Sequence, residues 1–192
     1  MVSVVAKKSS GQVVIEFKSL RYHDETYNIG DIVMISEHYD DTSFGTLVRV
    51  WRKKDKTDPM ARIRWFYKPA DVFPEKFGFL SQFELFDSDH EQDISVMSLY
   101  GKATVLSFEE YHALDEVDED VYFSRAKYFV NDNSIRPPLE EWQRVCVCNE
   151  ILNPDLMYVE CDKCRKFHHP KCVGVEGKED EPWVCFKCVI NS

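Results

Sequence analysis

The residues best suited to chemistry are cysteines and histidines in the last quarter of the 192-residue sequence. All seven cysteines lie between positions 146 and 188. The ligand-type residues form four pairs with one or two residues between the members of each: Cys146 and Cys148, Cys161 and Cys164, His169 and Cys172, and Cys185 and Cys188. The spacers between successive pairs are twelve, four and twelve residues long. Eight such residues suffice for two tetrahedral sites of the kind that zinc forms with thiolate and imidazole. The spacing therefore predicts two closed, structural zinc sites.

The number and crowding of the cysteines bear on their chemistry. An odd number in one short window argues against a disulfide framework and favours metal ligands in a reducing compartment. A module this small cannot bury enough apolar surface to fold alone, so metal binding is expected to contribute about 10–16 kcal/mol per site. The alternative, in which these cysteines are small buried hydrophobic residues, is disfavoured because it gives no reason for paired spacing.

The order of four cysteines, one histidine and three cysteines is similar to that of the PHD finger family. The resemblance implies a cross-braced pairing, with Cys146, Cys148, His169 and Cys172 on one zinc and Cys161, Cys164, Cys185 and Cys188 on the other. It selects His169 over His168, and it matches Trp183 to an aromatic residue of the family core. A RING finger, the ubiquitin-ligase relative, would place its histidine fourth in the order, where this sequence has Cys164.

The PHD resemblance also implies a peptide site. Tyr158 and Phe167 match two positions of the family's methyl-lysine cage, although phenylalanine replaces the tryptophan that binds a cation best. Two further cage positions hold Val145 and Leu152. The implied ligand is methylated or unmodified lysine 4 of histone H3, and a purely structural finger is the alternative. Three acidic residues are expected to pair with the basic tail in the binding case: Asp155, Glu160 and Asp162.

The cysteine-free part of the sequence reads as short strands. β-branched and aromatic runs at 28–36, 45–51 and 61–67, bounded by turn residues, predict a mainly β domain. A helix is expected from Ser107, which has Glu110 at the third helical position as in a capping box. A double proline in "NDNSIRPP" predicts a domain boundary. The expected organisation is an extension at 1–20 with a strand in "QVVIEF", a β domain at 21–135, a linker at 136–143 and the zinc finger at 144–190.

The segments "RWFYKP", "ELFDSDH", "GKATV", "YHALDEV" and "VYFSRAKYF" occur in the order and spacing of a BAH domain. A BAH domain followed by a PHD finger resembles a family of short plant histone readers. The resemblance implies a β-barrel-like domain with short helices that reads trimethyl-lysine 27 of histone H3. Trp65 and Tyr67 share one face of a strand, so they can form two walls of a cage or fill a core. Phe44 is the expected third wall, and His90 and Asp93 are expected along the peptide channel.

The formal net charge of −10 disfavours nucleic acid as a direct partner and favours a basic peptide. No apolar run is long enough for a transmembrane helix, and the first residues do not resemble a signal peptide. We therefore expect a nuclear histone H3 reader without catalytic activity, which recruits a transcription-regulating, repressive chromatin complex and has no membrane partner. The alternatives are a ubiquitin-ligase-like zinc adaptor and a scaffold that contacts a chromatin complex without reading a mark.

Overall fold

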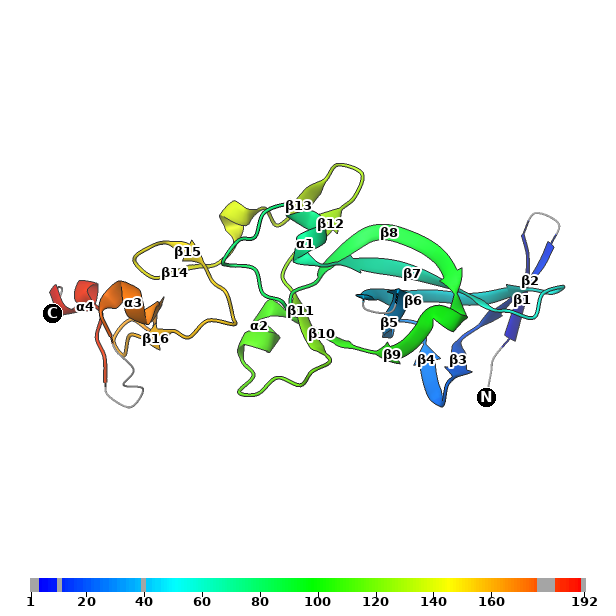
Figure 1. The fold of residues 1–192 in the computed structure, drawn as a ribbon, viewed down its shortest axis with the longest axis horizontal. Helices are drawn as coiled ribbons and strands as arrows, with labels where there is room; N and C mark the ends of the chain where they lie inside the picture. Colours follow the sequence, from blue (N-terminus) through cyan, green and yellow to red (C-terminus); the bar gives the residue numbers. More distant parts are fainter. Residues whose placement is uncertain (1–3, 10–11, 39–40, 176–181, 191–192) are drawn as a thin grey trace. The chain divides into compact units, whose positions relative to one another are not determined.

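The computed structural model describes residues 4–9, 12–38, 41–175 and 182–190 (Figure 1). The chain divides into two compact units. The first unit comprises residues 1–74 and 83–136, and the second comprises residues 75–82 and 137–192. The division at 136 falls inside the double-proline segment. Residues 75–82 differ from the expectation, because the sequence placed them in the β domain and the structure groups them with the second unit.

Within the described residues, the first unit is built on a nine-stranded sheet (Figure 1). Its order is β1-β2-β6-β7-β8-β12-β13, and β5 pairs with both β6 and β9. The strands are β1 (Val4–Ser9), β2 (Gln12–Phe17), β5 (Ile32–His38), β6 (Asp41–Lys53), β7 (Met60–Tyr67), β8 (Phe86–Ser95), β9 (Leu99–Lys102), β12 (Lys127–Phe129) and β13 (Ser134–Arg136). The predicted mainly β fold is confirmed, and so is the strand in "QVVIEF", which is β2.

Shorter elements surround this sheet. They are β3 (Ser19–Tyr22), β4 (Glu25–Asn28), α1 (Pro69–Val72), η1 (Val96–Ser98), β10 (Thr104–Ser107), α2 (Phe108–His112) and β11 (Val121–Ser124). The expected capping box is present, because the Glu110 backbone N–H donates to Ser107 Oγ while Glu110 Oε2 accepts from the Ser107 backbone. The helix ends at His112, and Leu114 beyond it is exposed.

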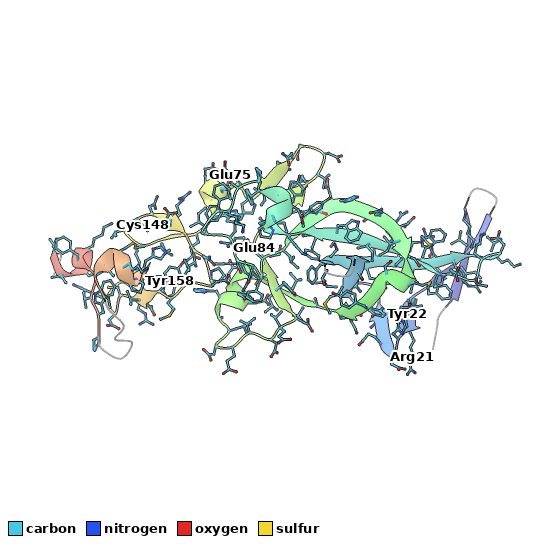
Figure 2. All side chains as sticks on the ribbon, in the orientation of Figure 1. Arg21, Tyr22, Glu75, Glu84, Cys148 and Tyr158 are labelled. Carbon is cyan, nitrogen blue, oxygen red and sulfur yellow. The ribbon has the colours of Figure 1, made fainter. Side chains whose placement is uncertain are left out.

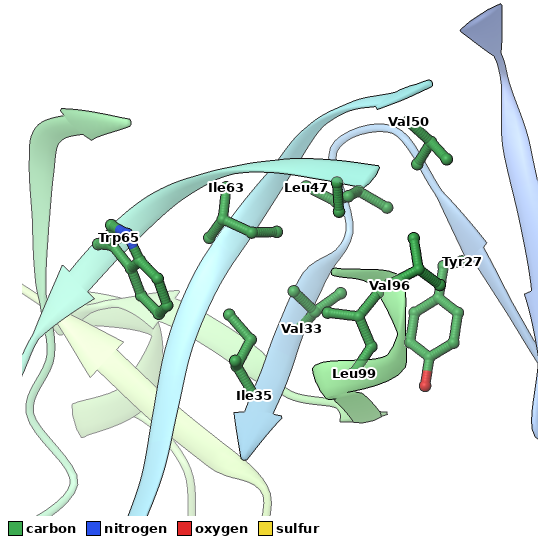
Figure 3. Packing of buried hydrophobic residues seen from close by; sticks show 10 residues of the cluster. Tyr27, Val33, Ile35, Leu47, Val50, Ile63, Trp65, Val96 and Leu99 are labelled. Atoms are coloured by element: carbon green, nitrogen blue, oxygen red, sulfur yellow. The ribbon is translucent and has the colours of Figure 1, made fainter. Parts of the chain in front are cut away.

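Strand β7 shows how the sequence places its side chains. Ala61, Ile63 and Trp65 alternate along the strand and are buried, whereas Arg62 and Arg64 between them are only half-buried. Successive strand residues point to opposite faces, so one face of β7 joins the apolar core. Figure 3 shows Ile63 and Trp65 on the same side of this strand, beside Leu47 and Ile35.

The neighbouring strand β6 needs a glycine next to this core. Gly45 is paired with Trp65, and a Cβ atom on Gly45 would lie only 2.1 Å from a methyl group of Ile63. The Ile63 side chain thus occupies the space that a side chain at position 45 would need.

The second unit contains short elements only. They are η2 (Leu139–Glu141), β14 (Arg144–Val145), β15 (Glu150–Ile151), β16 (Val159–Glu160), β17 (Phe167–His168), α3 (Pro170–Val173) and α4 (Phe186–Ile190). Its buried apolar side chains are few, chiefly Trp142, Val145, Ile151 and Leu152. So small a core agrees with a fold that needs metal ions. In the described part of the chain, none of the helices has the length and apolar character that crossing a membrane requires.

Candidate functional site

The eight predicted ligand residues form two groups of four in the second unit. Their ligand atoms lie within 4.8 Å of one another, and the groups are Cys146, Cys148, His169 and Cys172, and Cys161, Cys164, Cys185 and Cys188. The His169 Nδ1 atom is 3.3 Å from Cys148 Sγ, and the Cys164 and Cys185 sulfurs are 3.8 Å apart. Zinc–sulfur bonds of about 2.3 Å in a tetrahedron place sulfurs roughly 3.8 Å apart. Both groups therefore fit a tetrahedral zinc ion, and the cross-braced pairing is the one expected.

In each group, one thiol has a lowered pKa and another has a raised pKa. Burial alone would raise the pKa of Cys146, but hydrogen bonds from the backbone of Cys148 and His169 outweigh it and lower that pKa to about 5. Burial and hydrogen bonds to Cys146 and Cys148 raise the pKa of Cys172 to about 11. The second group behaves likewise, with the pKa of Cys161 lowered to about 6 and that of Cys188 raised to about 12 by burial. A bound divalent cation would let all the thiolates of a group ionise together.

A basic groove of about 680 Å³ lies beside these groups. In the described part of the chain it is lined by no carboxylate and by five cationic residues, Arg144, Lys163, Arg165, Lys166 and Lys187. The Lys163 ammonium donates to the Cys188 carbonyl, and Arg165 pairs with Glu160 at 2.8 Å. Thiolate-rich zinc sites carry net negative charge. We interpret these cations as the balance of that charge in an otherwise acidic protein.

The two predicted aromatic residues of the finger lie near one another. The Tyr158 and Phe167 rings are 6.2 Å apart at 56°, and both residues are half-buried. Tyr158 immediately precedes β16 and Phe167 lies on β17, and these strands pair so that Phe167 stands opposite Glu160. Figure 2 labels Tyr158 on this unit. The Tyr158 ring also contacts the His169 ring, with centroids 5.0 Å apart, and the other two implied cage positions, Val145 and Leu152, are buried.

The three acidic residues predicted to meet a basic tail all have partners inside the second unit. Asp155 accepts from Ser81 Oγ at 2.8 Å, Glu160 pairs with Arg165, and Asp162 accepts from the Trp183 backbone N–H at 2.6 Å. Asp162 thus holds the segment that carries the last two cysteines. Sequence alone could not separate two of these bonds from tail contacts, because Ser81 and the Trp183 backbone N–H are remote in sequence from their aspartate partners.

The second predicted site lies in the first unit, where a cavity of about 260 Å³ opens at the ends of β6 and β7. The expected cage residues Phe44, Trp65 and Tyr67 all line it, together with Ser43, Phe66, Lys68, Asp71, His90 and Gln92. Trp65 is only 6% exposed and belongs to the core cluster, so it serves both the cavity and the core. The Phe44 ring also contacts the Tyr122 ring, with centroids 4.5 Å apart. The cavity thus combines aromatic faces with a few polar groups, as small cation sites do.

The two predicted channel residues have different positions. His90 lines the cavity, and its Nδ1 atom is 2.8 Å from the Tyr67 hydroxyl. Asp93 is not among the cavity-lining residues and instead makes a two-point ion pair with Arg62, at 2.8 and 2.9 Å. The hydrogen bond from Arg62 lowers the pKa of Asp93 below its usual value. The reason for the difference is register, since Asp93 stands directly opposite Arg62 in the β7–β8 pair.

Three residues that the sequence did not single out complete this site. The Trp65 indole N–H donates to Gln92 at 3.2 Å, and the Tyr128 ring packs edge-on against Tyr67 at 5.0 Å. Asp71 on α1 places a carboxylate in the cavity lining. Burial, with Tyr128 adding to it, raises the pKa of Tyr67, so its hydroxyl stays protonated at neutral pH. His90 and Gln92 alternate on β8, and that spacing was the available sequence signal.

Comparison with known proteins identifies the first unit. A family model described as "BAH domain" matches residues 25–140, which is more than half of the chain. The chain belongs to the BAH domain family. Two curated Arabidopsis thaliana proteins are similar to it: "Chromatin remodeling protein SHL" is 32% identical over 66% of this chain and 56% of its own length. "Chromatin remodeling protein EBS" is 32% identical over 65% of this chain and 54% of its own length.

The chain spans about half the length of these two curated relatives. Among solved structures, the yeast Rsc2 BAH domain superposes with a TM-score of 0.51, covering 62% of this chain and 52% of that chain at 16% identity. At this identity the likeness shows the fold alone. The aromatic cavity lies within the stretch matched as BAH, and the two metal-ligand groups lie beyond it.

Proposed function

We propose that this protein is a nuclear chromatin reader whose BAH domain binds trimethylated lysine on the histone H3 tail. The observation that carries the proposal is the cavity lined by Phe44, Trp65 and Tyr67. A trimethylammonium group keeps its charge but cannot donate a hydrogen bond, so aromatic faces bind it by cation–π attraction at about 0.5–2 kcal/mol per face. The same lining holds an acidic side chain, Asp71, and a basic side chain, Lys68. By analogy with the implied family site, the mark is lysine 27.

The second unit extends the proposal to a PHD-type finger with two structural zinc ions. Its paired rings, Tyr158 and Phe167, are the proposed wall for lysine 4 of the H3 tail, methylated or unmodified. All eight ligand positions are taken by the two groups, so a bound zinc has no open position for a substrate. The proposed role is therefore binding rather than catalysis. The net charge of −10 favours association with a lysine-rich tail.

The proposed cellular role is recruitment of a transcription-regulating, repressive complex to marked chromatin. Two features support it: the matched relatives are named as chromatin remodeling proteins, and the cavity suits a cationic side chain. A ubiquitin-ligase-like adaptor and a scaffold that reads no mark remain the competing functions.

Calorimetric titration of the whole zinc-loaded chain tests the proposal. Histone H3 peptides around lysine 27 are offered in trimethylated and unmodified form, and we expect the trimethylated peptide to bind at least several-fold more tightly. Equal affinities for the two peptides would contradict the proposal and favour a scaffold that reads no mark. Ubiquitin discharge from a loaded conjugating enzyme in the presence of the chain would favour the adaptor.

A further inference from the structure

Residues 75–82 form part of the second unit although they lie between two strands of the BAH domain in sequence. The Asn153 side-chain amide donates to the Gly78 carbonyl at 2.9 Å, and the Ser81 hydroxyl donates to Asp155 at 2.8 Å. The Phe79 ring packs edge-on against Trp142, with centroids 6.1 Å apart. Ser81 is fully buried and Asn153 is 5% exposed. Gly78 and Asp155 are exposed, so each hydrogen bond joins one buried side chain to a partner at the surface.

Asn153 connects this segment to the proposed lysine-4 site. Its backbone N–H donates to the Tyr158 hydroxyl, and that hydroxyl donates back to the Asn153 carbonyl, both at 3.0 Å. Its side-chain oxygen accepts from the Asp155 backbone N–H at 3.0 Å, while its side-chain nitrogen is bonded to Gly78. Every strong polar group of Asn153 is therefore used. A change at Gly78 reaches Tyr158 through Asn153 alone, whereas a change at Ser81 reaches it through Asp155 and then Asn153.

The orientation of Tyr158 matters for what the finger can read. Its ring lies 6.2 Å from Phe167, and a two-ring site depends on the angle between its faces more than a full cage does. Phenylalanine at 167 already offers a weaker face than tryptophan. We therefore expect the Tyr158 ring to contribute more than the Phe167 ring to any preference of the finger for a methylated lysine.

From these contacts, and on the basis of the proposed function, we propose that Ser81 and Asn153 are positioning residues for methyl-lysine selection by the finger. The segment 75–82 holds Asn153 and Asp155 in place, and Asn153 holds the Tyr158 ring. A finger without that segment would keep its eight metal ligands and the contact between the Tyr158 and His169 rings, but would lose the hydrogen bonds with Gly78 and Ser81 that fix Asn153 and Asp155.

The test uses the whole zinc-loaded chain with three H3 peptides: lysine-4 trimethylated, lysine-4 unmodified and lysine-27 trimethylated. The informative variants are Asn153→Asp, which removes the amide donor to Gly78 with little change of shape, and Ser81→Ala. Ser134→Ala is the matched control, because the Ser134 hydroxyl also donates to an aspartate, Asp132 at 2.7 Å, but in the first unit. Zinc content and melting temperature are measured for every variant.

We expect Asn153→Asp to weaken binding of the lysine-4 trimethylated peptide by about five- to tenfold, the size typical of one lost buried hydrogen bond. Binding of the unmodified peptide should fall less, so methyl selectivity drops, while the lysine-27 peptide and the control variant are unaffected. Ser81→Ala should shift selectivity in the same direction.

Three results would overturn the inference. Unchanged selectivity in both variants, with a wild-type chain that does prefer the methylated peptide, refutes it alone. Equal losses for all three peptides together with lost zinc assign these contacts to folding only. A wild-type chain without any lysine-4 preference removes the proposed finger function, and the inference with it.

Discussion

Replacement of Tyr67 by alanine separates cage binding from core packing better than any change at Trp65. Trp65 belongs to the buried core cluster, so its truncation would cost about 3–5 kcal/mol of stability and confuse the result. Tyr67 is half-buried and is one of three predicted aromatic walls of a 260 Å³ cavity. Tyr128 packs against Tyr67 but does not line the cavity, so it cannot replace the missing face. Loss of one cation–π face predicts affinity about 2- to 30-fold weaker.

The assay is calorimetric titration of a lysine-27 trimethylated peptide against wild type, Tyr67→Ala and Tyr67→Phe. The phenylalanine variant removes the hydroxyl that meets His90 and keeps the ring, so it should bind within about threefold of wild type. Circular dichroism is used to check that both variants fold. Wild-type affinity in a folded Tyr67→Ala protein would refute the cage.

Further predictions concern the metal groups and two ion pairs. Cys161→Ser should lower the zinc content, measured by mass spectrometry, from two ions per chain to one, while lysine-27 peptide binding persists. Glu84→Ala strands Arg125 in a pair whose side chains are 0% and 7% exposed, and should cost about 3–5 kcal/mol in chemical denaturation. Asp93→Asn removes a partly exposed pair with Arg62 worth about 0.2–1 kcal/mol at neutral pH. Because its folded pKa is lowered, that difference should vanish as pH falls through the folded pKa, and denaturation curves at several pH values check it.

The two groups of candidate metal ligands could be predicted from the sequence because the types and spacing of such residues are dictated by coordination geometry. Each short cysteine pair supplies two ligands from one tight turn, whatever surrounds it. Trp65 and Tyr67 were placed on one side of a strand by alternation alone, and the structure has both in the cavity lining. In each case a local rule was sufficient.

The features that the sequence did not predict depend on contacts between residues far apart in the chain. A local sequence pattern does not encode such contacts. No sequence pattern in residues 75–82 indicates that they pack with the rest of the second unit. They are joined to it by individual hydrogen bonds, such as the one from Ser81 to Asp155. Asp93 was expected beside the peptide channel, but the β7–β8 register pairs it with Arg62. Register depends on the whole sheet and could not be fixed from one segment.

We propose that the aromatic cavity of the BAH domain binds methylated lysine because that side chain is cationic. The most direct test of this proposal uses two H3 peptides that differ in one atom at position 27: one has trimethyl-lysine, and the other has its neutral analogue with carbon in place of nitrogen. The two side chains have nearly the same shape, so any difference in affinity reports the charge. We expect the cationic peptide to bind several-fold more tightly to the whole chain, and equal affinities would contradict the account.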